Sequence, residues 1–120
     1  METIANKHID LTYLKQLSNG SNEFINEMIT VFMKQTPVEI SNLEKYLKAK
    51  DWKSLRGTAH KMKPSFSFMG IKELEGTIKL IDEYAATETH LELLPDMINK
   101  VKNICNEAIK ELEIEKKLYL

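Results

Sequence analysis

His60 is the residue in this sequence best suited to chemistry. It lies in the segment 58–70, which reads TAHKMKPSFSFMG. On an ideal helix its side chain points about 130° away from the centre of the apolar stripe, towards solvent. Arg56 lies one turn before it and Lys63 one turn after it. An imidazole that is uncharged near pH 7 can act as a nucleophile, here between two cations. On this pattern alone, a solvated surface histidine is the simpler interpretation.

A helix must position His60, because apolar residues recur around it at steps of three and four. That stripe predicts one helix, which Asp51 can cap and Gly70 can close. Its members are Trp52, Leu55, Ala59, Met62, Phe66 and Met69.

The same periodicity predicts helices in the rest of the chain. A short one runs from Asp10 to Gly20, and Ser21 opens the next. Phe24, Met28, Val31 and Phe32 are expected to face inward there. After Gly70 and after the polar connection 86–90, two further stripes are Ile71, Leu74, Ile78, Ile81 and Ala85, then Leu94, Ile98, Val101, Cys105, Ala108 and Leu112.

Thr36 and Pro37 interrupt the second helical segment. Thr36 can cap a helix, Pro37 suits its first position, and Glu39 would complete a capping box. The pattern indicates a fresh helix start or a kink, continuing to about Lys50.

Strand-like alternation is lacking, so the sequence predicts an all-α fold. Short connections between long amphipathic helices favour an up-down antiparallel four-helix bundle with an additional short N-terminal helix. At 120 residues, we expect a single domain spanning residues 1–120.

The composition argues against several functions. The net charge of −1 gives no general attraction to nucleic acid or to an anionic membrane. No apolar run approaches the roughly 20 residues that span a bilayer, and the N-terminus lacks a signal peptide's apolar core. We expect a cytoplasmic protein in which Cys105, the one cysteine, is a buried apolar residue. His8 and His90 have no acidic or cysteine companions at metal-ligand spacing, so no metal site is expected. A glycine-rich phosphate loop is lacking, which argues against ATP binding by this chain.

The spacing His60-x-x-Lys63, followed by small residues and by Gly70, resembles the signature of the histidine-containing phosphotransfer (HPt) domain. The helical context from Phe32 to Ala85 is similar to that family too. The resemblance implies a phosphorelay carrier whose His60 accepts and donates phosphoryl groups. Lys63 matches the family lysine that stabilises the phosphoryl group by charge-assisted hydrogen bonds.

The resemblance also implies partners: the receiver domains of response regulators and a hybrid sensor kinase. The chain needs no cofactor of its own, and Mg²⁺ is expected on the partner receiver domain. Gly57 and Ser67 are small and leave room for that partner to approach His60. Alternatively, Gly57 is only a weak point of the helix. The helical wheel places Arg56 on the same docking surface. Alternatively, Arg56 only makes the surface more soluble. Phe68 is either an exposed docking aromatic or a buried residue rotated inward by Pro64.

Pro64 departs from the family pattern, which has glycine after the lysine. Proline cannot donate to the carbonyl of His60, and its ring crowds that carbonyl. Two outcomes are open: a kinked helix that continues, or a helix that ends near His60. The unbroken stripe from Met62 to Met69 favours the first.

A second function of another class is a helical bundle that only binds partners and does no chemistry. The presence of both His60 and Lys63 favours the carrier. The sequence leaves open whether the chain is a stand-alone protein or a module of a hybrid sensor histidine kinase, and we expect it to be a monomer.

Overall fold

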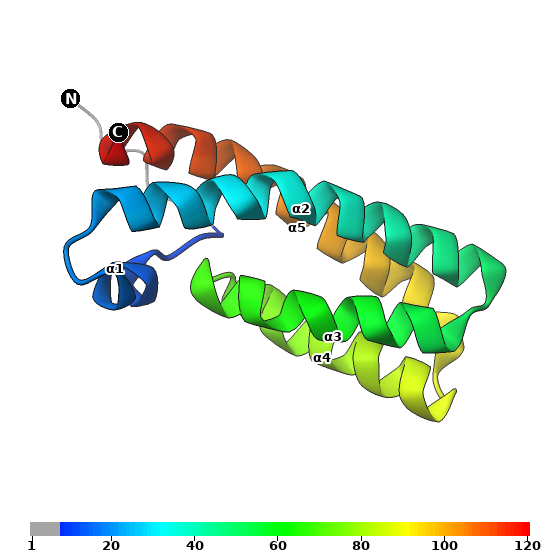
Figure 1. The fold of residues 1–120 in the computed structure, drawn as a ribbon. Coiled ribbons are helices and arrows are strands. Elements are labelled where there is room, and N and C mark those ends of the chain that lie inside the picture. The colour runs from blue at the N-terminus through cyan, green and yellow to red at the C-terminus, as the bar shows by residue number, and fades with distance from the viewer. Residues whose placement is uncertain (1–7) are drawn as a thin grey trace.

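The computed structural model describes residues 8–120, and within them every regular element is helical. These residues form five α-helices, and two 3₁₀ turns flank the last of them. Figure 1 shows how the helices are arranged. The all-α prediction is confirmed. The helices are α1 (Thr12–Ser18), α2 (Asn22–Ala49), α3 (Trp52–Phe68), α4 (Lys72–Thr87) and α5 (Leu94–Lys116), with turns η1 (Leu91–Leu93) and η2 (Lys117–Tyr119).

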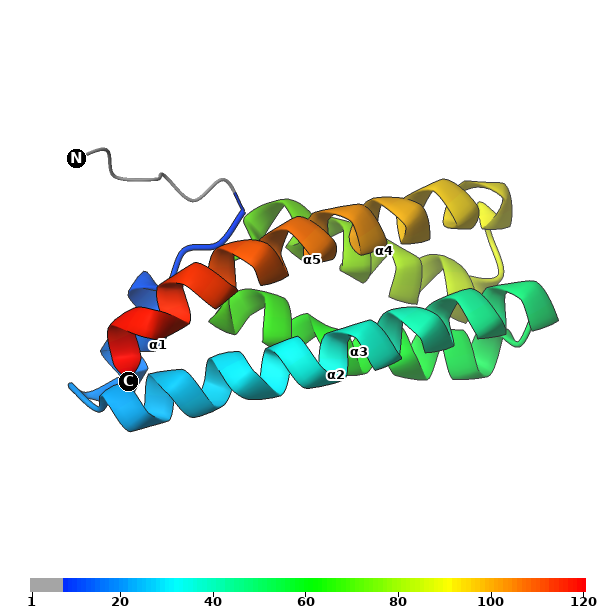
Figure 2. The same ribbon diagram turned by 90° about the horizontal axis from the view of Figure 1, so that it is seen from above.

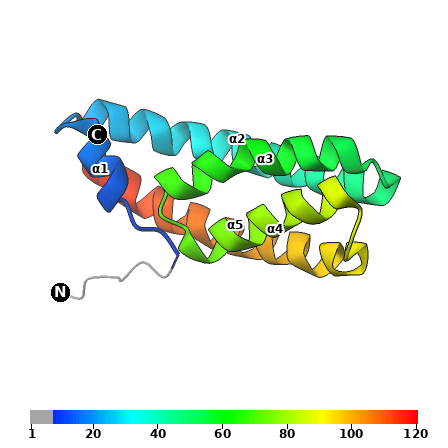
Figure 3. The ribbon, with the colours of Figure 1, turned by 90° about the horizontal axis from the view of Figure 1, so that it is seen from below.

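The four long helices form an antiparallel bundle, as predicted. Helix α2 packs against α3 and α5, and α4 packs against the same two helices from the other side. Figures 2 and 3 show this arrangement from above and from below. The short helix α1 lies at one end of the bundle and contacts α2. Each long helix, including α3, therefore keeps an outer surface that no other long helix covers.

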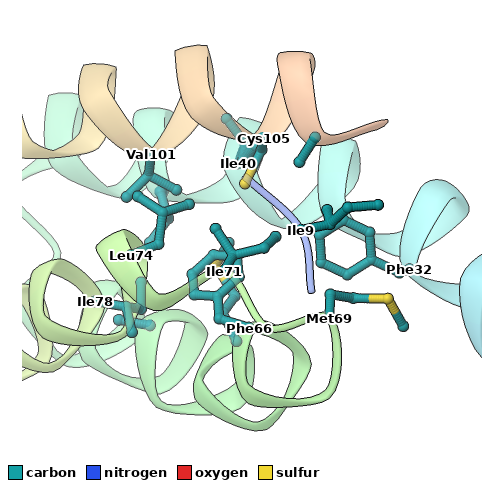
Figure 4. Packing of buried hydrophobic residues seen from close by; sticks show 14 of the residues in the cluster. Ile9, Phe32, Ile40, Phe66, Met69, Ile71, Leu74, Ile78, Val101 and Cys105 are labelled. Atoms are coloured by element: carbon teal, nitrogen blue, oxygen red, sulfur yellow. The ribbon is translucent and has the colours of Figure 1, made fainter. Parts of the chain in front are cut away.

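The core lies along the bundle axis and is built from the predicted stripes. All six apolar residues predicted for α5, including Cys105, are buried, and so are the five predicted around α4. Figure 4 shows the packing of Ile40, Leu74 and Cys105, which belong to three different helices. Phe32 of α2 meets the edge of Phe66 of α3, with ring centroids 6.5 Å apart. Burial raises the pKa of the Cys105 thiol to about 12, consistent with its role as a small apolar residue.

Side-chain caps explain where two of these helices begin. The Ser21 hydroxyl accepts a hydrogen bond from the backbone N–H of Phe24 at 3.1 Å, at the start of α2. The Asp51 carboxylate accepts one from the N–H of Ser54 at 3.1 Å, at the start of α3. Both predicted starts are confirmed. At α1, the Asp10 carboxylate accepts from the N–H of Thr12 at 3.0 Å, and the helix itself begins at Thr12.

Of the two alternatives predicted at Thr36 and Pro37, a fresh helix start or a kink, the fresh start is wrong. Helix α2 runs without a break from Asn22 to Ala49 and contains Pro37. Thr36 and Glu39, predicted to form a capping box, are both buried inside it. The apolar stripe passes through this region, and its burial against α3 and α5 outweighs the local capping signal. Val31, predicted to face inward, is 46% exposed, while its neighbours Ile29 and Phe32 are buried.

His8 is held between α4 and α5 by carboxylates that the sequence did not associate with it. Its Nδ1 contacts Glu73 of α4, and its Nε2 lies 2.6 Å from the Glu107 carboxylate of α5. Its backbone N–H donates to Glu111 at 3.1 Å. Burial by itself lowers the pKa of His8, but the hydrogen bonds with Glu73 and Glu107 outweigh it and raise the pKa. The segment leading into α1 is thereby fixed across the bundle.

No helix within residues 8–120 combines the length and the apolar character needed to cross a membrane.

Candidate functional site

His60 projects from the uncovered surface of α3, near the middle of the helix. Its side chain is 75% exposed, whereas the preceding residue, Ala59, is buried. Arg56, four residues earlier, is 60% exposed, and Lys63, three residues later, is 34% exposed. These spacings place the three side chains on one face of the helix. The structure therefore brings together the histidine and the two cations that the sequence singled out.

Helix α3 continues through Pro64 to Phe68, so the alternative in which the helix ends near His60 is wrong. Pro64 is exposed, and its missing N–H leaves the carbonyl of His60 without the usual helical donor. The continuous stripe explains why the helix survives, since Met62, Phe66 and Met69 are all buried on both sides of the proline. His60 consequently lies within a helix rather than at its C-terminus, where the dipole would disfavour a phosphate.

Asp82 of α4 completes the cluster, and it was not among the residues predicted from the sequence. Its side chain is only 10% exposed. One oxygen, Oδ1, accepts from Arg56 Nε at 3.3 Å, and the other, Oδ2, accepts from Lys63 Nζ. His60 Nδ1 lies 3.4 Å from the same Oδ2. One buried carboxylate therefore contacts all three of the α3 side chains.

The charge of Asp82 is stabilised by these neighbours. Burial by itself raises the pKa of its carboxyl, but the hydrogen bonds from Lys63 and His60 outweigh burial. The pKa consequently lies below its ordinary value, and the carboxylate is ionised at neutral pH. The site thus holds one negative charge between two positive ones, beside an exposed imidazole.

One signal in the sequence points to Asp82. It lies four residues after Ile78 and three before Ala85, so it falls on the apolar stripe of α4. An acidic residue at such a position is buried and requires partners. Nothing in the sequence says that its partners are Arg56, His60 and Lys63, because that depends on how α3 and α4 are aligned.

Small residues and an aromatic pair border the surface near His60. Gly57 and Ser67 are both exposed, and a Cβ added at Gly57 would have no atom within 4 Å. Phe68 is half-buried and stacks on Tyr13 of α1, with ring centroids 6.1 Å apart and an interplanar angle of 9°. Phe68 is therefore neither fully exposed nor fully buried: it packs against the core and keeps part of its ring at the surface. Tyr13, which is 48% exposed, extends this aromatic surface and had no signal in the sequence.

Gly70 lies in the turn between α3 and α4, with φ of +65°. Its N–H donates to the carbonyl of Ser67 at 3.2 Å. A residue with a side chain is disfavoured in this left-handed conformation, so glycine suits the tight return of α4 alongside α3.

A helical bundle that exposes an imidazole beside two cations on one helix fits the class of histidine phosphotransfer domains. The comparisons with known proteins agree. The family model described as the Hpt domain matches residues 27–111, and the chain belongs to that family. The fold is similar to a crystal structure of histidine-containing phosphotransfer protein B (HptB) from Pseudomonas aeruginosa PAO1. The TM-score is 0.85 at 24% sequence identity, over 97% of this chain and 100% of that chain. No curated protein matches the sequence.

Membership of the family decides between the two predicted functions. The protein is a histidine phosphotransfer domain of a two-component phosphorelay, and such domains interact with receiver domains and kinases. The alternative, a bundle that only binds partners, is not favoured.

Proposed function

We propose that His60 is the residue that carries the phosphoryl group and that Lys63 stabilises it there. The observation that carries this proposal is the 75% exposure of the His60 side chain on the face of α3 that also presents Lys63 and Arg56. Of the other two histidines, His8 is held between Glu73 and Glu107, and the ring of His90 packs on Tyr84 at 4.8 Å. His60 is thus the histidine best placed to meet a partner's active site.

The chemistry follows from this placement. An uncharged imidazole nitrogen attacks the phosphorus of a receiver's aspartyl phosphate, and the aspartate leaves with the electron pair of the broken P–O bond. The ammonium of Lys63, one turn from His60, can turn towards the phosphoryl oxygens and offset their negative charge. In the reverse step, a second receiver's aspartate attacks the same phosphorus and His60 leaves.

The docking surface that we propose surrounds His60 on α3. Gly57 and Ser67 allow close approach, Arg56 offers positive charge, and Pro64 and Phe68 offer apolar contact. Support comes from their exposure or half-exposure on one side of the helix. The Mg²⁺ that takes part belongs to the receiver, so this chain needs no cofactor. We further propose that the domain is monomeric and works in the cytoplasm, where receiver domains and the kinase are available.

Incubation with a ³²P-labelled, phosphorylated receiver domain tests the proposal. We expect acid-labile, base-stable label on the protein, retained in His8→Gln and His90→Gln but lost in His60→Gln. These two histidines are matched controls because each variant removes one imidazole from the same chain. Label that persists in His60→Gln, or unlabelled wild-type protein across several receivers, would contradict the proposal.

A second variant tests Lys63. Lys63→Ala should slow transfer by roughly tenfold, the scale of losing one hydrogen bond to a charged group. Because Lys63 is only partly buried and Asp82 keeps its contact with Arg56, circular dichroism should show an intact bundle. The matched control is Lys61→Ala, which removes an exposed ammonium from the same helix and should transfer at the wild-type rate. Equal rates for the two variants would show that Lys63 has no role beyond general charge.

A further inference from the structure

Asp82 contacts the imidazole on the nitrogen that faces the protein. Its Oδ2 lies 3.4 Å from His60 Nδ1, a long hydrogen bond. An ionised carboxylate can only accept, so Nδ1 must carry the proton in this pair. In the uncharged ring, the lone pair is then on Nε2, the nitrogen farther from Asp82. The contact selects one of the two tautomers of His60.

The same carboxylate restrains the cation next to the nucleophile. Oδ2 accepts from Lys63 Nζ, while Oδ1 accepts from Arg56 Nε at 3.3 Å. Because Asp82 is 10% exposed, water screens these contacts less than it would at an open surface. The ammonium of Lys63 therefore interacts with Asp82 as well as with any phosphoryl group on His60.

We propose that Asp82 is a positioning residue for phosphotransfer, which keeps the proton of His60 on Nδ1 and draws Lys63 away from the phosphorylated ring. The inference rests on the proposed role of His60 and adds a determinant on α4. Its consequence is a site that passes the phosphoryl group on rather than storing it.

The proton on Nδ1 matters because the charge of the ring changes during phosphoryl transfer. The lone pair of Nε2 forms the N–P bond, and the P–O bond to the receiver's aspartate breaks with its electron pair on oxygen. The ring keeps its Nδ1 proton and becomes positively charged, and the Asp82 carboxylate stabilises that charge. In this protonated state the ring is a good leaving group for the return step, because it departs as a neutral imidazole.

Removing the charge of Asp82 should therefore affect both phosphoryl transfer to His60 and transfer from it. In Asp82→Asn the amide can donate to Nδ1 and favour the wrong tautomer, which slows attack by Nε2. Once phosphorylated, the ring loses its Nδ1 proton more readily, and Lys63 is free to bind the phosphoryl oxygens. The phosphohistidine should then be longer lived but a poorer donor.

Two measurements test this inference, with Glu83→Gln as the matched control. Glu83 is the next residue of α4, is exposed, and loses the same charge. Nitrogen NMR of the unphosphorylated protein should show protonated Nδ1 and bare Nε2 in the wild type and in Glu83→Gln. Asp82→Asn should show a mixture or the other tautomer. This readout needs no phosphoryl transfer, so it remains informative if the proposed function fails.

Rapid-quench transfer to and from a receiver is the second measurement. We expect Asp82→Asn to be roughly tenfold slower or more in both directions, with slower spontaneous loss of label. The rate of donation should also begin to fall at a lower pH than in the wild type, and Asp82→Glu should restore part of the activity. Wild-type tautomers and rates in a folded Asp82→Asn would overturn the inference, as would equal effects in Glu83→Gln. If wild-type His60 takes no label, the proposed function fails instead.

Discussion

The backbone of Asp10 lies directly against Gly70. The N–H of Asp10 donates to the carbonyl of Met69 at 3.0 Å, and a Cβ built on Gly70 would be 2.1 Å from the carbonyl oxygen of Asp10. The segment before α1 therefore crosses the α3–α4 turn at a point where only glycine fits. This contact connects the N-terminal segment to the end of the helix that carries His60.

Gly70→Ala should destabilise the protein by at least about 2 kcal/mol, because it adds both a steric clash and left-handed strain. Gly20→Ala is the matched control. Gly20 also has positive φ, +87°, but a Cβ there would meet nothing within 4 Å. Urea unfolding followed by circular dichroism measures both variants. Equal losses would show that the contact with Asp10 contributes nothing.

Gly57→Ala should raise the stability of the protein but weaken partner docking. Gly57 is within α3 and a Cβ there has open space, so alanine should stabilise the helix by up to about 1 kcal/mol. Gly76 of α4 has the same open surroundings, and Gly76→Ala should give a similar gain. Only Gly57→Ala, one turn from His60, should weaken receiver binding, as measured by calorimetry. Unchanged receiver affinity in Gly57→Ala would remove Gly57 from the docking surface.

Pro64→Ala should stabilise the protein by roughly 1–2 kcal/mol, less than the full cost of about 3 kcal/mol for proline in a helix, because the helix has already adapted to it. Pro64 is exposed, so its ring adds little packing, and alanine supplies an N–H for the carbonyl of His60. Pro37→Ala makes the same change in α2, also at an exposed position. Thermal unfolding of both variants is the measurement. A loss of stability in Pro64→Ala alone would mean that the proline is required where it stands.

Glu39 should make stability depend on pH. Burial raises the pKa of its carboxyl, only partly offset by the positive charge of Lys61. Because the folded pKa lies above the unfolded one, the contribution of Glu39 is most favourable below the unfolded pKa. It is lost as pH rises through the folded pKa. Glu39→Gln should therefore gain roughly 1 kcal/mol at pH 7 and little at pH 4.5.

Urea unfolding at the two pH values measures this difference. The control is Glu27→Gln, an exposed glutamate of the same helix, which should change stability little at either pH. A gain in Glu39→Gln that is the same at both pH values would rule out titration of Glu39 as its cause.

Local patterns were enough to predict most of the helices. The stripe from Leu94 to Leu112 is buried throughout, because a helix places residues three and four apart on one side whatever it packs against. The caps at Ser21 and Asp51 were predicted for a similar reason, since each acts within three residues. The fresh helix start considered at Thr36 and Pro37 does not occur, because packing of the same stripe against two other helices outweighs a local cap.

The sequence by itself determined that the chain is helical and that His60, Arg56 and Lys63 share one exposed face, because these facts depend on spacing within a single helix. Only the tertiary structure decided which residues of other segments meet them. Asp82 contacts His60, Tyr13 stacks on Phe68, and Glu73 and Glu107 hold His8. Each of these contacts depends on how two segments are aligned, and that alignment is set by burial of the whole core rather than by any short pattern.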